Sequence, residues 1–153
     1  MKNIILLLLR FALGIGFLSA VADRLGFWGS PGDPAAAWGN WENFIQYTGK
    51  LNFDVSAAFA NGLGIIATAL EIAFGILLII GYKIKYIALY SGILLLIFGL
   101  EMSINTHLKS ALDASVFAAS FGALLLSIQP TGKWSVDYLL QKNKIKTSFS
   151  KDS

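Results

Sequence analysis

The chain has 153 residues, a formal net charge of +3, no cysteine and one histidine, and 56% of its residues are hydrophobic. That fraction exceeds the roughly 45 to 50% of an ordinary soluble domain, and the missing cysteines exclude disulfides, thiol redox chemistry and cysteine-ligated metal centres. The basic residues gather in short loops and at the chain end, which indicates membrane orientation rather than nucleic-acid binding.

The first predicted membrane span covers residues 4–22. Its apolar run is interrupted only by Arg10 and is long enough to cross a hydrocarbon core of roughly 30 Å. A secretory signal is the alternative, because Lys2 precedes the run and Ala20–Ala22 resembles a cleavage site. A charge is unfavourable in the apolar region of a signal, so we expect the segment to remain as a span.

Residues 23–54 form a predicted outer loop that is rich in glycine, proline and tryptophan. Asp33 can cap a helix that begins at Pro34, and the apolar spacing predicts a short interfacial helix at about residues 34–48. Tryptophan favours the level of the lipid headgroups, although an aromatic substrate cage is the alternative. Three interfacial anchors are expected: Trp28, Trp38 and Trp41.

Three further spans are predicted at about residues 55–82, 86–104 and 111–128. The turn at Lys83 and Lys85 is so short that the spans on either side of it must be antiparallel. The predicted fold is therefore an all-α integral membrane protein. It consists of an antiparallel bundle of four transmembrane helices in residues 1–130 and a basic tail in residues 131–153.

The distribution of lysine and arginine predicts the orientation of the chain. Most of these residues lie at the N-terminus, in the Lys83–Lys85 turn and in the tail, and the positive-inside rule places that side in the cytoplasm. Four spans then put both termini inside the cell and the tryptophan-rich loop outside it.

Arg10 and Glu71 are ionisable groups within predicted spans, where charges are costly and are functional candidates by default. Counted from Lys2 and Lys83 at 1.5 Å per residue, both lie roughly 12 to 18 Å from the cytoplasmic surface. Equal depth predicts an intramembrane ion pair. Such a pair can fix the helix register or can bind the polar head of a ligand, and the sequence leaves both roles open.

A second group of polar residues is expected near the outer boundary. Its members are Asp23, Arg24, Glu101, Asn105, His107 and Asp113. A histidine beside carboxylates can exchange protons at neutral pH or supply one metal ligand, whereas the alternative is an exposed loop histidine. We expect no metal site.

The order and spacing of several short motifs resemble the DoxX family along nearly the whole chain. They are Arg10 with Leu13, Gly14 and Phe17, the segment Leu70–Gly75 around Glu71, the exit at Gly81 and Tyr82, and the segment Gly132–Asp137. The resemblance implies a small multi-pass protein of the bacterial inner membrane. The family's intramembrane Arg and Glu correspond to Arg10 and Glu71, and its cytoplasmic Ser-x-Asp corresponds to Ser135 and Asp137. The long tryptophan-rich loop departs from the shortest members.

The resemblance also implies a function, because founding relatives are membrane subunits that feed electrons from thiosulfate oxidation to quinone. On this hypothesis the chain binds quinone, holds no covalently bound cofactor and depends on a membrane or peripheral partner for the redox centre. One alternative is a non-catalytic scaffold or assembly factor. Another is a small proton-coupled transporter, which would require a homo-oligomer. Whether the chain belongs to an enzyme at all stays open.

Overall fold

The computed structural model describes residues 1–130 and 132–149, with side chains up to residue 143. Within these ranges all the regular secondary structure is helical. Its elements are α1 (Lys2–Arg24), α2 (Trp41–Leu51), α3 (Ala57–Ile80), α4 (Ile84–Met102), the π-helix η1 (Ser103–His107), α5 (Leu108–Asp113), α6 (Val116–Ser127) and α7 (Val136–Phe149). Of the predicted tail 131–153, residues 131 and 150–153 lie outside the described part.

Three helical segments are long and apolar enough to cross a membrane: Lys2–Arg24, Ala57–Ile80 and Ile84–Asp113. The last one includes a π-helical stretch, where the hydroxyls of Ser103 and Thr106 donate hydrogen bonds to the carbonyls of Gly99 and Met102, at 2.6 Å each. Such back-bonding competes with regular helical hydrogen bonds. The membrane prediction is therefore supported by three helices.

The fourth predicted span, residues 111–128, is not one continuous helix. Ser115 has a φ of +54° and separates α5 from α6. Helix α6 is apolar but has only 12 residues, which at 1.5 Å per residue amounts to about 18 Å. By itself α6 is too short to cross a hydrocarbon core of roughly 30 Å.

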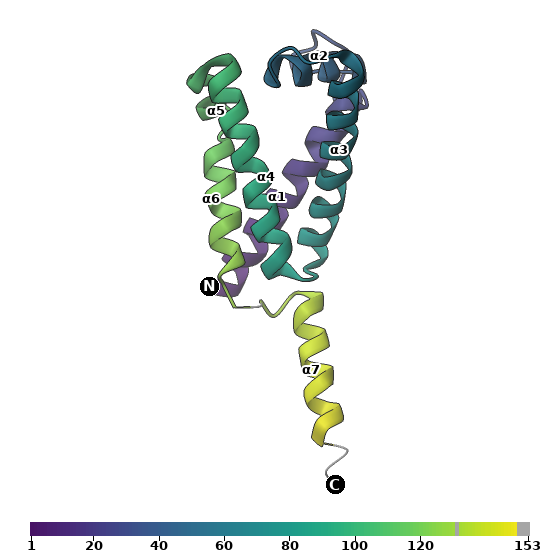
Figure 1. Cartoon of the computed structure of the whole chain (residues 1–153). Helices are drawn as coiled ribbons and strands as arrows, with labels where there is room; N and C mark the ends of the chain where they lie inside the picture. Colours follow the sequence, from purple (N-terminus) through teal and green to yellow (C-terminus); the bar gives the residue numbers. More distant parts are fainter. Residues whose placement is uncertain (131, 150–153) are drawn as a thin grey trace.

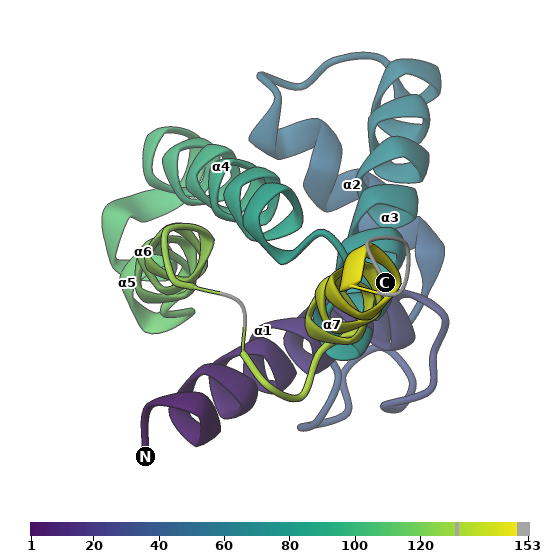
Figure 2. The same ribbon diagram turned by 90° about the horizontal axis from the view of Figure 1, so that it is seen from below.

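The apolar helices form two pairs that diverge toward one end of the molecule (Figure 1). Helix α3 packs on α1, and α6 packs on α4. We call the end where α3 turns into α4, at Gly81–Lys83, the turn end, and the opposite end, with α2 and the loop before it, the loop end. Helix α2 lies across the loop end, and α7 projects from the turn end (Figure 1). In Figure 2 α1 runs obliquely along one side of the bundle, from the N-terminus toward α3.

The hydrophobic core lies mainly at the turn end. All four apolar helices contribute to it, through Leu13, Phe17, Leu78, Ile84, Ala88, Ala123 and Leu126. Small residues bring the backbones of each pair close together. A Cβ on Gly14 would lie 2.8 Å from the carbonyl oxygen of Gly75, and the Ser120 hydroxyl donates to the Gly92 carbonyl at 2.7 Å.

Helix α2 begins later than the sequence predicts, at Trp41 instead of about residue 34. The Asp33 carboxylate accepts a hydrogen bond from the Ser30 amide at 2.6 Å and so closes a turn rather than capping a helix. Gly39, with a φ of +69°, precedes the actual cap, Asn40, whose side chain accepts from the Asn43 amide at 2.8 Å. Trp38 consequently lies in the loop and not on the helix.

Candidate functional site

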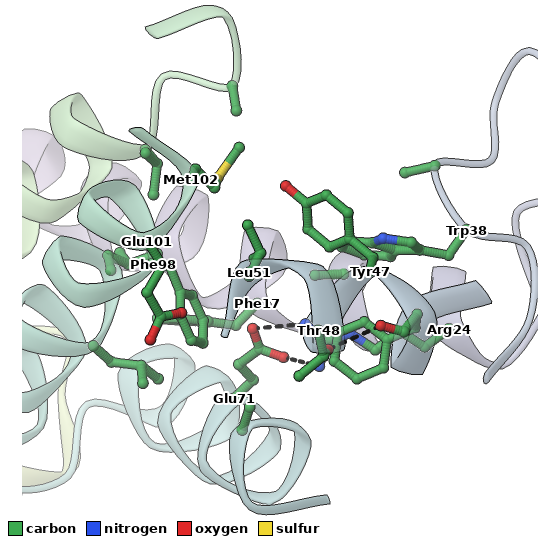
Figure 3. Close-up of a pocket in the computed structure, with 18 of the residues that line it drawn as sticks. Phe17, Arg24, Trp38, Tyr47, Thr48, Leu51, Glu71, Phe98, Glu101 and Met102 are labelled. Atoms are coloured by element: carbon green, nitrogen blue, oxygen red, sulfur yellow. Dashed lines mark hydrogen bonds and ion pairs between the residues drawn. The ribbon is translucent and has the colours of Figure 1, made fainter. Parts of the chain in front are cut away.

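A cavity of about 940 Å³ lies between the two diverging helix pairs at the loop end (Figure 3). Helices α1, α3, α4 and α6 provide its walls, and α2 covers it. The walls are mostly apolar, and include Phe17, Leu95 and Phe98. Its volume is at the upper end of the roughly 300 to 1,000 Å³ typical of small-molecule pockets. The cavity is therefore the candidate site.

A buried ion pair between Arg24 and Glu71 forms one side of this cavity. The two residues are each only 3% exposed. The Arg24 Nη2 donates to Glu71 Oε1 at 2.9 Å, its Nη1 forms an ion pair with Oε2, and Nη1 also donates to the hydroxyl of Thr68 at 2.7 Å. The third nitrogen of the guanidinium, Nε, is buried and has no hydrogen-bond partner among the described residues.

Aromatic rings enclose the same guanidinium. The Phe44 ring centroid lies 3.9 Å from Arg24 Cζ, and the Trp38 centroid lies 5.3 Å from it. Trp38 reaches this position because the Asp23 carboxylate accepts hydrogen bonds from the amides of Ala37, at 3.1 Å, and Trp38, at 2.8 Å. Asp23 at the end of α1 thus holds the outer loop so that Trp38 lies over Arg24.

Helix α2 is held over the cavity by polar contacts to its neighbours. The Trp41 Nε1 donates to the Asn61 side chain on α3 at 2.9 Å, and Asn105 of η1 donates to the Leu51 carbonyl at 2.6 Å. Tyr47 of α2 lines the cavity, and burial raises the pKa of its hydroxyl. Trp41 therefore ties α2 to α3, and its role as a membrane anchor stays a prediction.

Glu101 extends from α4 into the cavity on the side opposite Arg24, with Glu71 between them (Figure 3). It is half-buried, and its carboxylate has no ion pair or hydrogen bond among the described residues. Lys50 also lines the cavity but is exposed at the end of α2. Glu101 is thus an unpaired carboxylate in a largely apolar space.

The predicted ion pair between Arg10 and Glu71 does not form. Arg10 donates instead to three backbone carbonyls: Nε to Leu78 at 2.9 Å, Nη2 to Ile79 at 2.7 Å and Nη1 to Trp134 at 2.8 Å. The prediction of equal depth was wrong because α1 begins beyond the end of α3, so Arg10 lies at the level of the last turn of α3. The carbonyls at the C-terminus of a helix attract a cation there.

Ser135 and Asp137 belong to this turn end and not to the cavity. The Asp137 carboxylate accepts hydrogen bonds from the amides of Lys83, at 2.8 Å, and Ile84, at 2.9 Å, and so caps α4. The Ser135 hydroxyl accepts from the amide of Tyr138 at 3.2 Å at the start of α7. Together with Arg10 these residues join the α3–α4 turn to the segment after α6.

The predicted outer polar cluster is only partly assembled. Arg24 and Glu101 line the cavity, Asp23 organises the loop beside it, and Asn105 contacts α2. His107 is exposed, and Asp113 forms an exposed ion pair with Lys109. In the described ranges no three side chains of the metal-binding types gather at one point.

The third predicted anchor, Trp28, lies at the loop end with its side chain 51% exposed. Its Nε1 donates to the Ser19 carbonyl of α1 at 3.1 Å. This position is compatible with a place at the lipid headgroups, but anchoring by Trp28 stays a prediction.

The sequence contained a signal for the buried role of Arg24. Arg24 follows Arg10 by fourteen residues, which is nearly four helical turns, so the two side chains share one face of α1. Gly14 and Phe17 lie on the same face and are buried. This spacing indicates that Arg10 and Arg24 lie on the buried face of α1, so Arg24 could have been predicted as a buried cation rather than only as a member of the outer polar group.

Comparisons with protein-family models, curated proteins and solved structures found no match for this chain.

Proposed function

We propose that this chain is a DoxX-like protein of the bacterial inner membrane and that its cavity binds a quinone for a partner oxidoreductase. The observation that supports this best is the cavity itself, an apolar space of about 940 Å³ with the buried guanidinium of Arg24 at its edge. A quinone has a hydrocarbon tail and a ring whose oxygens accept hydrogen bonds, and these properties match the walls and the donor.

The residues fit such a ligand on chemical grounds. Arg24 Nε is a buried donor without a partner among the described residues, and an unsatisfied buried polar group is costly. Because protein atoms cover Nε in this structure, a ligand oxygen would satisfy it only after the Arg24 side chain shifts toward the cavity. Glu71 holds the guanidinium in place through both carboxylate oxygens, and Phe44 and Trp38 restrict its movement from the sides. These contacts orient Arg24 before the ligand arrives, which lowers the cost of binding.

A bound quinone would accept electrons or return them, and a partner protein would supply the second redox centre. The cysteine-free chain itself offers no thiolate ligands for a metal cluster. The role of this chain would be to hold the quinone ring away from water and to place it within reach of the partner.

The experiment is mass spectrometry on protein purified gently from its native membrane. We expect stoichiometric quinone together with a subunit that contains flavin or haem or handles sulfur compounds. Ala67→Phe fills the cavity from α3 and should remove the quinone, whereas Ala69→Phe adds the same ring at an exposed position outside the cavity and should not. Quinone that is absent from the wild type, or equally present in both variants, would contradict the proposal.

The proposal includes four membrane spans, with α5 and α6 together forming the fourth, and both termini in the cytoplasm. The natural chain has no cysteine, so single cysteines introduced at Ser30 and at Gln141 report topology without background. We expect an impermeant thiol reagent added to intact spheroplasts to label the first position only. Labelling of both positions or of the second alone would exclude this topology.

A proton-coupled transporter is a second candidate, because two carboxylates, Glu71 and Glu101, line one cavity. Proteoliposomes that contain the protein would then acidify or alkalinise in response to a substrate gradient. A non-catalytic assembly role is the third, and the projection of α7 from the bundle, with Trp134 and Leu139 exposed, favours it (Figure 1). Co-purification of assorted membrane proteins without quinone would support that role.

A further inference from the structure

The proposed binding of quinone involves Arg24 and leaves the carboxylate of Glu101 without an assigned role. Its carboxylate extends into the cavity, whereas the other buried carboxylate, Glu71, is already held by Arg24 (Figure 3). No described residue donates a hydrogen bond to the Glu101 side chain or forms an ion pair with it. A ligand hydroxyl in the cavity would therefore be a donor for this carboxylate.

The two sides of the cavity differ in hydrogen-bonding character. A guanidinium only donates, and an ionised carboxylate only accepts. Arg24 Nε therefore matches any ligand oxygen, but Glu101 matches only an oxygen that carries a hydrogen atom. A quinone ring has two carbonyl oxygens, both acceptors, whereas its reduced form, the hydroquinone, has two hydroxyl groups that can donate as well as accept.

We propose that Glu101 is a specificity-determining residue that makes the cavity prefer the hydroquinone over the quinone. A hydroxyl of the hydroquinone donates to the Glu101 carboxylate, which extends into the cavity. With the oxidised ring the carboxylate would face a carbonyl oxygen, and two acceptors would meet without a proton between them. This inference rests on the proposed quinone binding and assigns the redox state that the site favours.

The size of the preference follows from the type of hydrogen bond. A hydrogen bond to a charged group is worth more than one between neutral groups, and its loss leaves the carboxylate without a partner. We expect the wild type to bind the hydroquinone at least about tenfold more tightly than the quinone. Replacement of the carboxylate by an amide, which both donates and accepts, should reduce the ratio to about one.

The experiment measures the affinity of a short-chain quinone and of its hydroquinone for the protein in nanodiscs, without oxygen, by quenching of tryptophan fluorescence. Three proteins are compared: the wild type, Glu101→Gln and the control Glu42→Gln. Glu42 lies exposed on α2 and does not line the cavity, so this control removes a carboxylate without touching the site. Its ratio should equal that of the wild type.

The outcomes separate the two proposals. If the wild type binds neither compound, the proposed function itself fails. If it binds both with similar affinity, or if Glu101→Gln keeps the preference, quinone binding stands and the role of Glu101 is refuted. The wild-type ratio decides the question even if a variant folds poorly, and Glu101→Leu provides a second variant that should also lose the preference while it still binds the quinone.

Discussion

Substitution of Gly81 by alanine should damage the junction at the turn end. Gly81 ends α3 with a φ of +74° and a ψ of 45°, a left-handed conformation that alanine rarely adopts. A Cβ at this position would overlap Nη2 of Arg10 and lie 2.7 Å from the Cβ of Ser135. The added methyl group therefore meets both the arginine and the segment after α6.

Two terms set the expected size of this effect. The left-handed conformation costs alanine about 1 to 2 kcal/mol. Displacement of Arg10 Nη2 from the Ile79 carbonyl, now 2.7 Å away, removes a hydrogen bond to a charged group, worth about 1.5 to 3 kcal/mol. Together they predict that Gly81→Ala lowers the free energy of unfolding by about 2.5 to 5 kcal/mol.

The assay is reversible unfolding in mixed micelles, followed by circular dichroism. Gly62→Ala is the control, because Gly62 lies within α3 and a Cβ there has no atom within 4 Å; alanine should stabilise this helix by about 0.5 to 1 kcal/mol. In an Arg10→Ala background, Gly81→Ala should cost about 1.5 to 3 kcal/mol less, because the hydrogen-bond term is gone and only the conformational term and the contact with Ser135 remain. The reasoning is refuted if Gly81→Ala unfolds like the wild type, or if its cost is the same with and without Arg10.

Three further measurements test the structure. Glu71→Gln should cost about 3 to 5 kcal/mol in the same assay because it leaves a buried charge, whereas Arg24→Met combined with Glu71→Leu should restore most of the loss; a Glu71→Gln protein as stable as the wild type would argue against a structural pair. Asp137→Asn should cost about 0.5 to 2 kcal/mol, since Asp137 caps α4 through two amides, and an unchanged unfolding curve would contradict that cap. Burial raises the pKa of Tyr47 above its ordinary value of about 10, so the folded state holds the phenol proton more tightly than the unfolded state does. The contribution of Tyr47 to the free energy of unfolding is therefore complete below about pH 10 and is lost as the pH rises through the folded pKa. Tyr47→Phe should flatten that alkaline loss, and equal slopes in the two proteins would show that Tyr47 is not the cause.

The apolar segments could be predicted from the sequence because the membrane imposes a length and a composition on each span. The division of the last segment at Ser115 could not, because a single residue with positive φ in an apolar run has no compositional signature. The start of α2 was missed for a related reason. Asp33 and Asn40 are both good caps, and only the folded loop decides which amides each of them receives.

The partner of Glu71 was predicted wrongly because depth was counted from the charged residues at the helix ends. That count assumes that Lys2 and Lys83 lie at one level. The contacts of Arg10 with Leu78 and Ile79 show that α1 extends past the end of α3. The buried face of α1 can be predicted from the periodicity of its sequence. The offset of α1 along α3 cannot, because it depends on how the two backbones pack at Gly14 and Gly75.

Because the core is concentrated at the turn end, the two helix pairs are held together at that end and separate toward the other. The two pairs, α1 with α3 and α4 with α6, are packed together where Leu78, Ile84 and Leu126 meet, and the cavity lies toward their other ends, which α2 bridges. Over a length of about 30 Å, that of a 20-residue helix, a rotation of one degree at the packed end moves the other end by about 0.5 Å. A substitution at the turn end that rotates one pair would therefore change the width of the cavity, and it would also strain the hydrogen bonds by which α2 bridges the two pairs.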